Sequence, residues 1–492
     1  MAITINSQPT DDIIPVYTYY VPYVVTSTLN TESDFRYVFD LYTKASWNVT
    51  PYIFQSRVSS FPRGDGKGVF SPHMFLQSLV GEVDIDPFEE GFFRAQNHYE
   101  SFEIQLFEQY NPNIYYREVI SISATESQIG FALGEDGNPT QSVFEVGDLI
   151  FIDPLNKEVE PRLFGESEII SVTYSSTYSY INVATGSATA SPYNTKIGYI
   201  TNLLRYDSTT DRKGAINMTE QYLEYGNSKV DDFIMKTSSN GFFLSEHREQ
   251  VKYVYDSTYE TISYLTDQEA YPNFSDFQFK VDLYDNSSSL IQTLTYSITT
   301  PIGAIPTLYS GVGYKNLEEL ATVLGTTLST SAQTWEVNLL VSGATISNGM
   351  TYSLKTQCRE YDLIHLGFKN KLGGVDFYTF NLVSRYNSSV QRTIINRNLD
   401  YDFSNGDRGR DVIDQTIKEN WTINTDFITD YEALFIRELI ESPQVYLIDN
   451  VNKKLIPIII TSNSYEFKST LNDELIQYTI NFEKSIDINS NI

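Results

Sequence analysis

The stretch DLIHLGFKNKLGGVDFYTFNLVSRYNSSVQRTIINR, residues 362–397, decides the fold class. It opens with an apolar run that ends at Phe368, breaks at Gly373 and Gly374, and continues as an alternating segment rich in aromatic and β-branched residues. Such content favours strand over helix, and paired glycines permit a tight turn because a positive φ costs them no Cβ clash. The stretch predicts a hairpin at the heart of a β domain, and it contains no evident reacting group.

The same stretch resembles a sequence pattern of virion proteins from tailed phages of Bacteroidetes, crAss-like phages in particular. The pattern follows Cys358 and consists of Phe368, Asn370, Leu372, Gly373, Gly374, Asp376, Tyr378 and Phe380. Residues 34–80, 242–266 and 434–483 fit the same resemblance, whereas 121–200 lie outside it. The resemblance implies a structural component of the tail or neck, and it supplies no catalytic residues.

Composition predicts a mainly β protein. The 492 residues are enough for about three domains, and 41% of them are hydrophobic. The 37 tyrosines and 29 phenylalanines argue against disorder, because disordered chains are poor in aromatic residues. We therefore expect a multi-domain architecture of β-sandwiches and a small barrel, with a few short helices.

Four domains are expected along the chain. An N-terminal arm and β-sandwich occupy 1–120, an SH3- or OB-like barrel is inserted at 121–200, a second sandwich covers 201–365, and an α+β domain covers 366–492. The barrel is indicated by FEVGDLIFI at 144–152 and the short strands after it. The two sandwiches are suggested by the likeness of SDFRYVFDLYT (33–43) to FSDFQFKVDLYD (274–285).

Three short helices are predicted. Residues 73–81 (HMFLQSLVG) follow Ser71 and Pro72, which suit an N-cap and a first helical position. Residues 312–325 have helical spacing at Leu317, Leu320, Ala321 and Leu324, with Gly325 as the stop. In 426–441 the apolar face would be Phe427, Tyr431, Leu434, Phe435 and Leu439, with Thr425 or Asp426 as the cap and Pro443 as the stop.

The net charge is −29, from 34 basic and 63 acidic residues. Such a field repels phosphate, so no specific nucleic-acid binding is expected. An acidic wall that does not grip DNA would still suit a position beside the DNA path, and acidity for solubility explains the charge equally well.

The single cysteine excludes an intramolecular disulfide and any zinc site built from cysteines. Cys358 is expected to be a small buried apolar side chain, with a reactive thiol as the alternative. The start MAITINSQPTDD lacks the pattern of a signal peptide, and no apolar run has the roughly 20 residues of a membrane span. With the resemblance, this implies synthesis in the host cytoplasm and a final location in the virion.

Several local sequence patterns could indicate a functional site, but each also has an ordinary structural explanation. Arg63-Gly64-Asp65 spells an integrin-type tripeptide, but a glycine-rich turn is the ordinary interpretation. Two acidic groups are conceivable cation sites, although neither has the spacing of a named calcium loop. These groups are Asp84, Asp86, Glu89 and Glu90, and Asp400, Asp402, Asn405 and Asp407.

No catalytic, cofactor-binding or metal-binding residue is predicted, so we expect no enzyme and no cofactor. Histidines 73, 98, 247 and 365 are scattered, and the carboxylate pairs Asp231-Asp232 and Glu318-Glu319 are interpreted as surface charge. We expect a homo-oligomer, in a ring, that also binds other tail or neck proteins through strand extension, aromatic contacts and the N-terminal segment 1–33, which would be an edge strand or an arm lying on a neighbour. The alternation at 475–485 suggests a sheet that could pair onward with a neighbouring subunit. The alternatives are a receptor- or carbohydrate-binding fibre protein and, more weakly, an enzyme acting on cell-wall polysaccharide.

Overall fold

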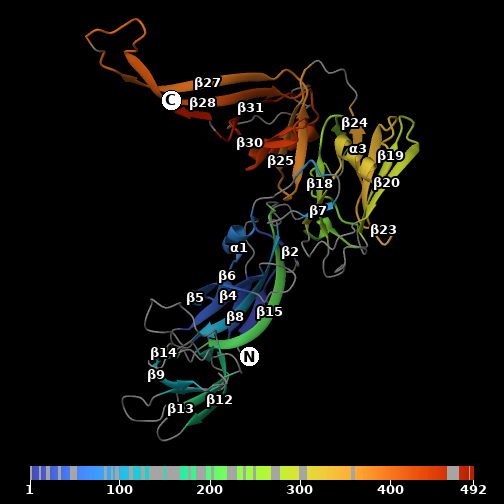
Figure 1. Ribbon diagram of the computed structural model, residues 1–492. Coiled ribbons are helices and arrows are strands. Elements are labelled where there is room, and N and C mark those ends of the chain that lie inside the picture. Colours follow the sequence, from blue (N-terminus) through green and yellow to red (C-terminus); the bar gives the residue numbers. More distant parts are fainter. Residues whose placement is uncertain are drawn as a thin grey trace. The chain divides into compact units, whose positions relative to one another are not determined.

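The computed structural model shows a mainly β chain with several sheets and a few short helices, which confirms the predicted fold class (Figure 1). In the described part of the chain, no helix is both long and apolar enough to cross a membrane. Cys358 lies outside that part. The structure describes residues 3–9, 13–17, 23–31, 35–44, 53–81, 86–89, 92–94, 99–109, 115–122, 128–131, 149–150, 167–174, 179–183, 196–200, 204–218, 230–236, 240–247, 251–266, 277–297, 307–355, 361–399, 401–462, 476–486 and 488–491.

The chain divides into two compact units, each formed from separate segments. The first unit contains Met1–Asp12, Tyr20–Phe75 and Ser101–Gly214, and the second contains Ile13–Tyr19, Leu76–Glu100 and Ala215–Ile492. The four predicted domain limits stay a prediction at this finer level.

Three sheets contain the strands of the first unit. In the first, β3 lies between β1 and β6, so β1 is an edge strand. The second has the order β15-β8-β4-β5, and the third has β11-β12-β13-β10-β9-β14. The bounds are β1 Ile3–Ser7, β3 Tyr23–Ser27, β4 Arg36–Lys44, β5 Ile53–Ser60, β6 Lys67–Phe70, β8 Tyr99–Gln109, β9 Tyr115–Ile122, β10 Gln128–Phe131, β11 Leu149–Ile150, β12 Ser167–Tyr174, β13 Ser179–Val183, β14 Lys196–Ile200 and β15 Leu204–Ile216.

The second unit also contains three sheets. Their orders are β16-β18-β21-β7, then β17-β24-β22-β19-β20 with β23 beside β22, and β26-β25-β29-β30-β31-β28-β27 with β32 beside β28. The short strand β2 of this unit belongs to none of these three sheets. The bounds are β2 Ile13–Pro15, β7 Phe92–Arg94, β16 Ile234–Met235, β17 Lys252–Val254, β18 Thr261–Thr266, β19 Phe277–Tyr284, β20 Leu290–Ser297, β21 Thr307–Gly311, β22 Thr334–Val341, β23 Ala344–Thr345, β24 Met350–Leu354, β25 Ile364–Lys369, β26 Val375–Phe380, β27 Arg385–Asn396, β28 Arg410–Asn424, β29 Val445–Asp449, β30 Lys454–Ile460, β31 Thr479–Lys484 and β32 Ile488–Asn491.

The two strands with similar sequences, β4 and β19, have similar places in their sheets. Each is paired on both sides, and each buries the aspartate of its shared Asp-Leu-Tyr sequence. Asp40 accepts two hydrogen bonds from Arg57 on β5, at 2.6 and 2.7 Å, and Asp282 accepts one of 2.7 Å from Thr293 on β20. A buried carboxylate needs such donors, because burial removes its hydration.

Helix α4, Asp430–Glu441, packs against the C-terminal sheet, but it begins four residues later than predicted. The prediction that Thr425 or Asp426 caps it is wrong. Thr429 is the N-cap, and it forms a capping box with Glu432 because the two side chains satisfy each other's backbone amides. The later start also leaves Phe427 outside the helix and exposed, and Leu434, predicted for the same apolar face, is exposed as well. The buried positions of the helix are Ala433, Phe435, Ile436, Glu438 and Leu439.

The other helices follow the predicted pattern more closely. In α3, Tyr314–Val323, the three predicted core residues Leu317, Leu320 and Ala321 are buried around Trp335, and Gly325 has φ +73° just beyond the helix end. Leu324, predicted to pack with them, is exposed instead because it lies past the last helical turn. The remaining helical elements are α1, His73–Leu79, and the 3₁₀ turn η1, Val230–Phe233.

The hairpin predicted from the opening stretch is confirmed as β25 and β26. Phe368 pairs with Asp376 across it, and Gly373 has φ +83° in the turn. However, β26 is an end strand of its sheet and stops at Phe380. It is buried nonetheless, because residues 244–246 and Tyr259 lie against it.

Candidate functional site

The hairpin turn is fastened to residues 244–246 by Asn370. Its Nδ2 donates to the backbone oxygen of Leu244 at 2.8 Å and to Oδ2 of Asp376 at 2.7 Å. Its Oδ1 accepts from the backbone amide of Gly374 at 2.9 Å, which closes the turn. A Cβ at Gly374 would collide with the oxygen of Leu244, so glycine is required here by close approach.

Asp376 is the centre of this contact and is 2% exposed. Besides Asn370, its carboxylate accepts from Oγ of Ser245 at 2.6 Å and from the amide of Glu246 at 3.2 Å. Three donors on one buried carboxylate offset its lost hydration. We call Leu244, Ser245, Glu246, Asn370, Gly374 and Asp376 the hairpin clamp.

A second buried group extends from the clamp. Lys252 and Glu260 form an ion pair of 2.7 Å with both side chains buried, and Lys252 lies 5.5 Å from the centre of the Phe377 ring. Burial raises the pKa of Glu260, although the charge of Lys252 opposes that rise. Removing either partner would leave an uncompensated buried charge, so the pair fixes the two segments that carry it.

His365 links the hairpin to the segment that carries Glu260. Its Nε2 lies 3.0 Å from the backbone oxygen of Tyr259, which only accepts, so Nε2 carries the proton. Its Nδ1 lies 2.8 Å from Oγ1 of Thr379 and accepts from it. Burial lowers the pKa of His365 to about 3, so the ring is neutral at pH 7 and both nitrogens are occupied.

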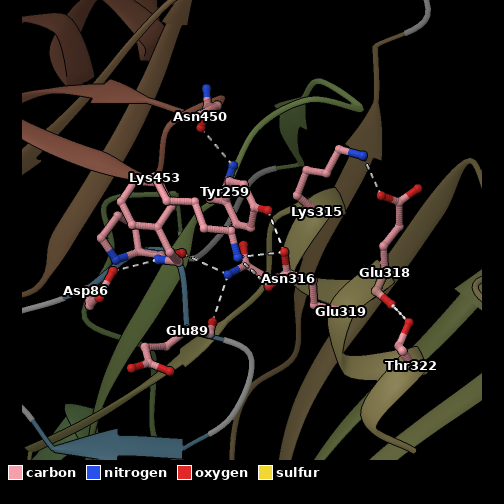
Figure 2. Close-up of polar contacts among 12 residues, drawn as sticks. Asp86, Glu89, Tyr259, Lys315, Asn316, Glu318, Glu319, Thr322, Asn450 and Lys453 are labelled. Carbon is pink, nitrogen blue, oxygen red and sulfur yellow. Dashed lines mark hydrogen bonds and ion pairs between the residues drawn. The ribbon is translucent and has the colours of Figure 1, made fainter. Parts of the chain in front are cut away.

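Asn316 of α3 joins three segments through one buried amide (Figure 2). Nδ2 donates to the backbone oxygens of Pro87 and Glu89, both at 2.8 Å, and Oδ1 accepts from the amide of Glu260 at 2.9 Å. All three of these partners are backbone groups. Asn316 therefore anchors residues 86–89 to the start of α3.

Tyr259 extends the same connection to the C-terminal sheet (Figure 2). Its hydroxyl donates to Oε1 of Glu319 at 2.5 Å, and Nζ of Lys453 lies 2.7 Å from that oxygen and 4.9 Å from the ring centre. Its amide donates to Oδ1 of Asn450 at 3.3 Å. Glu319, predicted to be surface charge only, is thus a bridge between α3 and the β29–β30 turn.

Two further buried titratable side chains lie beside the clamp. The ring of His247 packs 4.0 Å from that of Phe435, and burial together with Lys252 lowers its pKa well below the usual value. Burial, and then the charge of Glu246, raises the pKa of Glu438 to about 8. Both groups are therefore neutral at pH 7, as a closely packed interior requires.

The described cluster connects segments that are far apart in the sequence through buried polar contacts. Ser245 donates its proton to Oδ1 of Asp376 and accepts from the amide of His247 at 3.1 Å. His365 is bonded at both ring nitrogens, whereas Nδ1 of His247 is buried without a hydrogen-bond partner among the described residues. The cluster joins all three sheets of the second unit and α3 through desolvated polar contacts.

The structure gives a different outcome for each of the candidate sites predicted from the sequence. Residues 63–66 form a turn, with Gly66 at φ +77° and its amide bonded to the oxygen of Arg63 at 2.8 Å, so the turn interpretation is confirmed. In both acidic groups some members lie outside the described residues, namely Asp84, Glu90 and Asp400, as does His98. Asp86 accepts from the amide of Phe88, and Asp407 accepts from that of Ser404. The described residues contain no group of three or more metal-ligating side chains.

The sequence pattern contained Asn370, Gly374 and Asp376, but sequence reasoning missed their partners Ser245, Lys252, Glu260 and Asn316. For Ser245, Lys252 and Glu260 the available signal was a polar residue between apolar and aromatic ones, in FFLSEH and KYVYDSTYETISYL. Asn316 lies in neither stretch. Polar residues within such stretches are either exposed by alternation or buried and bonded, and spacing alone does not separate these cases.

Comparison with known proteins yields little. The chain matches no known protein family and no curated protein. Among solved structures, trypsin-activated alpha-2-macroglobulin from Escherichia coli is similar at 8% identity and a TM-score of 0.15 over 86% of this chain. The matched part is 40% of that chain, so this protein spans less than half of its length. A likeness of this size carries no argument about fold or function.

Proposed function

We propose that this chain is a non-enzymatic structural component of a tailed-phage virion, in the tail hub, collar or neck. It assembles with copies of itself, in a ring, and with neighbouring tail proteins. The proposal is supported by the resemblance of the 358–380 pattern to virion proteins and by what its residues do. Asn370, Gly374 and Asp376 all belong to the hairpin clamp, which is an internal joint.

The clamp is the observation that carries the proposal. A virion component transmits load between neighbours, and desolvated ion pairs and fully bonded amides resist shear between packed sheets because each sliding step exposes an unsatisfied group. The buried Lys252–Glu260 pair, the bonded Asn316 and the clamp itself are devices of this kind. The net charge of −29 suits a surface that lies beside DNA without binding it.

A receptor- or carbohydrate-binding fibre protein is the second candidate function. It is favoured by the aromatic side chains at the tip of the β27–β28 hairpin, where Tyr401 is fully exposed and Phe403 is 60% exposed. Exposed aromatic rings stack on sugars and fill pockets on partner proteins.

The mass of the purified chain, measured by light scattering alone and in mixtures with other virion proteins, tests the proposal. A ring, or a stable complex with a tail or neck protein, is the expected result. A monomer or slender trimer that ignores virion proteins and binds host cells would overturn it in favour of adhesion. Loss of that cell binding on replacing Tyr401 and Phe403 by serine would place the adhesive site at the hairpin tip.

A further inference from the structure

The hairpin of β27 and β28, residues 385–424, is an unusual surface feature of the second unit (Figure 1). All twelve residues of β27 are exposed, and β27 is an end strand of its sheet. On the other side, β28 is paired with β31 and β32. The alternating segment near 475–485 contributes β31, which is paired on both sides by β28 and β30, so β31 is not itself the strand at which this sheet could pair onward. Among the described strands of this sheet, β27 presents a long free edge.

The hairpin has one apolar and one polar face, and the β27 side chains of the apolar face are exposed. The register places Tyr386, Val390 and Ile394 on the same face, and they are 55%, 40% and 54% exposed. Their partners on β28 are Trp421, Ile417 and Val412, whereas the opposite face carries mainly polar residues. Alternation of this kind is typical of a strand pair with one buried face, and a long edge strand of this kind is a template for pairing. Something is therefore expected to cover this strand.

Charge indicates that the covering partner is another copy. Residues 385–424 contain six basic and six acidic side chains, so the whole net charge of −29 lies on the rest of the chain. Two copies repel each other over most of their surface but not at this hairpin. Moreover β27 itself contains Arg385 and Arg392 and no acidic residue, which favours approach to an acidic chain.

The sequence of β27 is also complementary to itself. In an antiparallel pair centred on Val390, Tyr386 would face Ile394 of the second copy and Ser388 would face Arg392 of the second copy. Aromatic and β-branched residues form favourable cross-strand pairs, and no two like charges would be opposed. A self-complementary patch of this kind is what a twofold contact requires.

We propose that β27 pairs antiparallel with β27 of a second copy, centred on Val390, so that the sheet continues from one chain into the next. This inference rests on the proposed self-assembly and names its contact. Because a twofold contact closes after two copies, a ring also uses another surface.

Cysteine cross-linking tests the register in a Cys358→Ser background. Facing residues of antiparallel strands have Cα atoms about 4.5 to 5.5 Å apart, which a disulfide spans. Val390→Cys is expected to give a covalent dimer on mild oxidation. Tyr386→Cys and Ile394→Cys are each expected to remain single chains, but a mixture of the two should form a dimer.

Light scattering tests the contact without oxidation. Val390→Lys places two like charges opposite each other and is expected to raise the dimer dissociation constant by at least about tenfold. Ile413→Lys is the matched control, because Ile413 is 44% exposed in the bulge of β28, away from the free edge, and its replacement should leave the mass unchanged.

The outcomes separate this inference from the proposed function. If the parent chain is oligomeric but Val390→Cys does not cross-link and Val390→Lys keeps the mass, the β27 contact is wrong and self-assembly stands. If the parent chain is a monomer at every concentration, the β27 contact is wrong, and complexes with other virion proteins then decide the proposed function alone.

Discussion

Replacing Asp376 by asparagine tests the hairpin clamp with the smallest change of shape. The carboxylate accepts from Ser245, from the amide of Glu246 and from Asn370 while only 2% exposed. Asparagine keeps one acceptor oxygen but puts an amino group where the other oxygen was. If the amino group replaces Oδ2, the amide of Glu246 and Nδ2 of Asn370 face a donor; if it replaces Oδ1, Ser245 must turn its hydroxyl and accept instead. In either orientation the hydrogen bonds to a charged carboxylate are lost.

The expected cost follows from those bonds. A hydrogen bond to a charged group contributes about 1.5–3 kcal/mol, and a buried donor without a partner costs about 1–3 kcal/mol. Relaxation and the retained oxygen offset part of this, so Asp376→Asn should lower the free energy of local opening by about 2–3 kcal/mol. Hydrogen exchange of the opened amides would then accelerate about 30- to 150-fold.

Amide hydrogen exchange at Glu246 and Gly374 is the assay, because both amides belong to the clamp. Asp402→Asn is the control, since Asp402 is exposed on the distant hairpin tip and its change should leave both amides unaffected. If Asp376→Asn changes the opening free energy by less than about 0.5 kcal/mol, the size of an ordinary surface substitution, the clamp does not hold the turn and the reasoning is refuted.

Three further outcomes are expected. The pKa of Glu438 is raised from 4.5 to about 8, so the contribution of this side chain to the stability of the protein is complete below pH 4.5 and is lost as the pH rises toward 8. Glu438→Gln should therefore flatten the decline of the urea midpoint over that range. Parallel curves for the variant and the parent would contradict this. The pKa of His365 is lowered from 6.5 to about 3, so the contribution of this side chain to the stability of the protein is complete above pH 6.5 and is lost as the pH falls toward 3. His365→Gln should therefore weaken the dependence of the urea midpoint on acid pH. An unchanged slope would exclude His365 as a source of that dependence. Gly374→Ala should destabilise the protein by about 1–3 kcal/mol in thermal unfolding through its clash with Leu244, while Gly406→Ala, where the nearest neighbouring atom is 3.7 Å away, should not; equal effects would show that the close approach is unimportant.

The sequence by itself determined the local elements. The glycine pair at 373–374 predicted the hairpin turn, and the helical spacing of Leu317, Leu320 and Ala321 predicted the buried face of α3. Both depend on backbone freedom and on short-range periodicity, which are readable from neighbouring residues. The same local rules misplaced the start of α4, because Thr425 and Thr429 are both acceptable caps and only the reciprocal bond to Glu432 selects Thr429.

Only the tertiary structure decided which polar residues are buried and which strand is free. Ser245 and Asp376 are 131 positions apart, yet they share a hydrogen bond of 2.6 Å. Sequence periodicity compares only residues that are a few positions apart. Likewise the alternation near 475–485 suggested a sheet that could pair onward, but β28 and β30 flank β31, and among the described strands of this sheet the long exposed end strand is β27. The reason is physical: a period of two specifies two faces of a strand, whereas strand neighbours and buried polar partners are set by long-range packing and register.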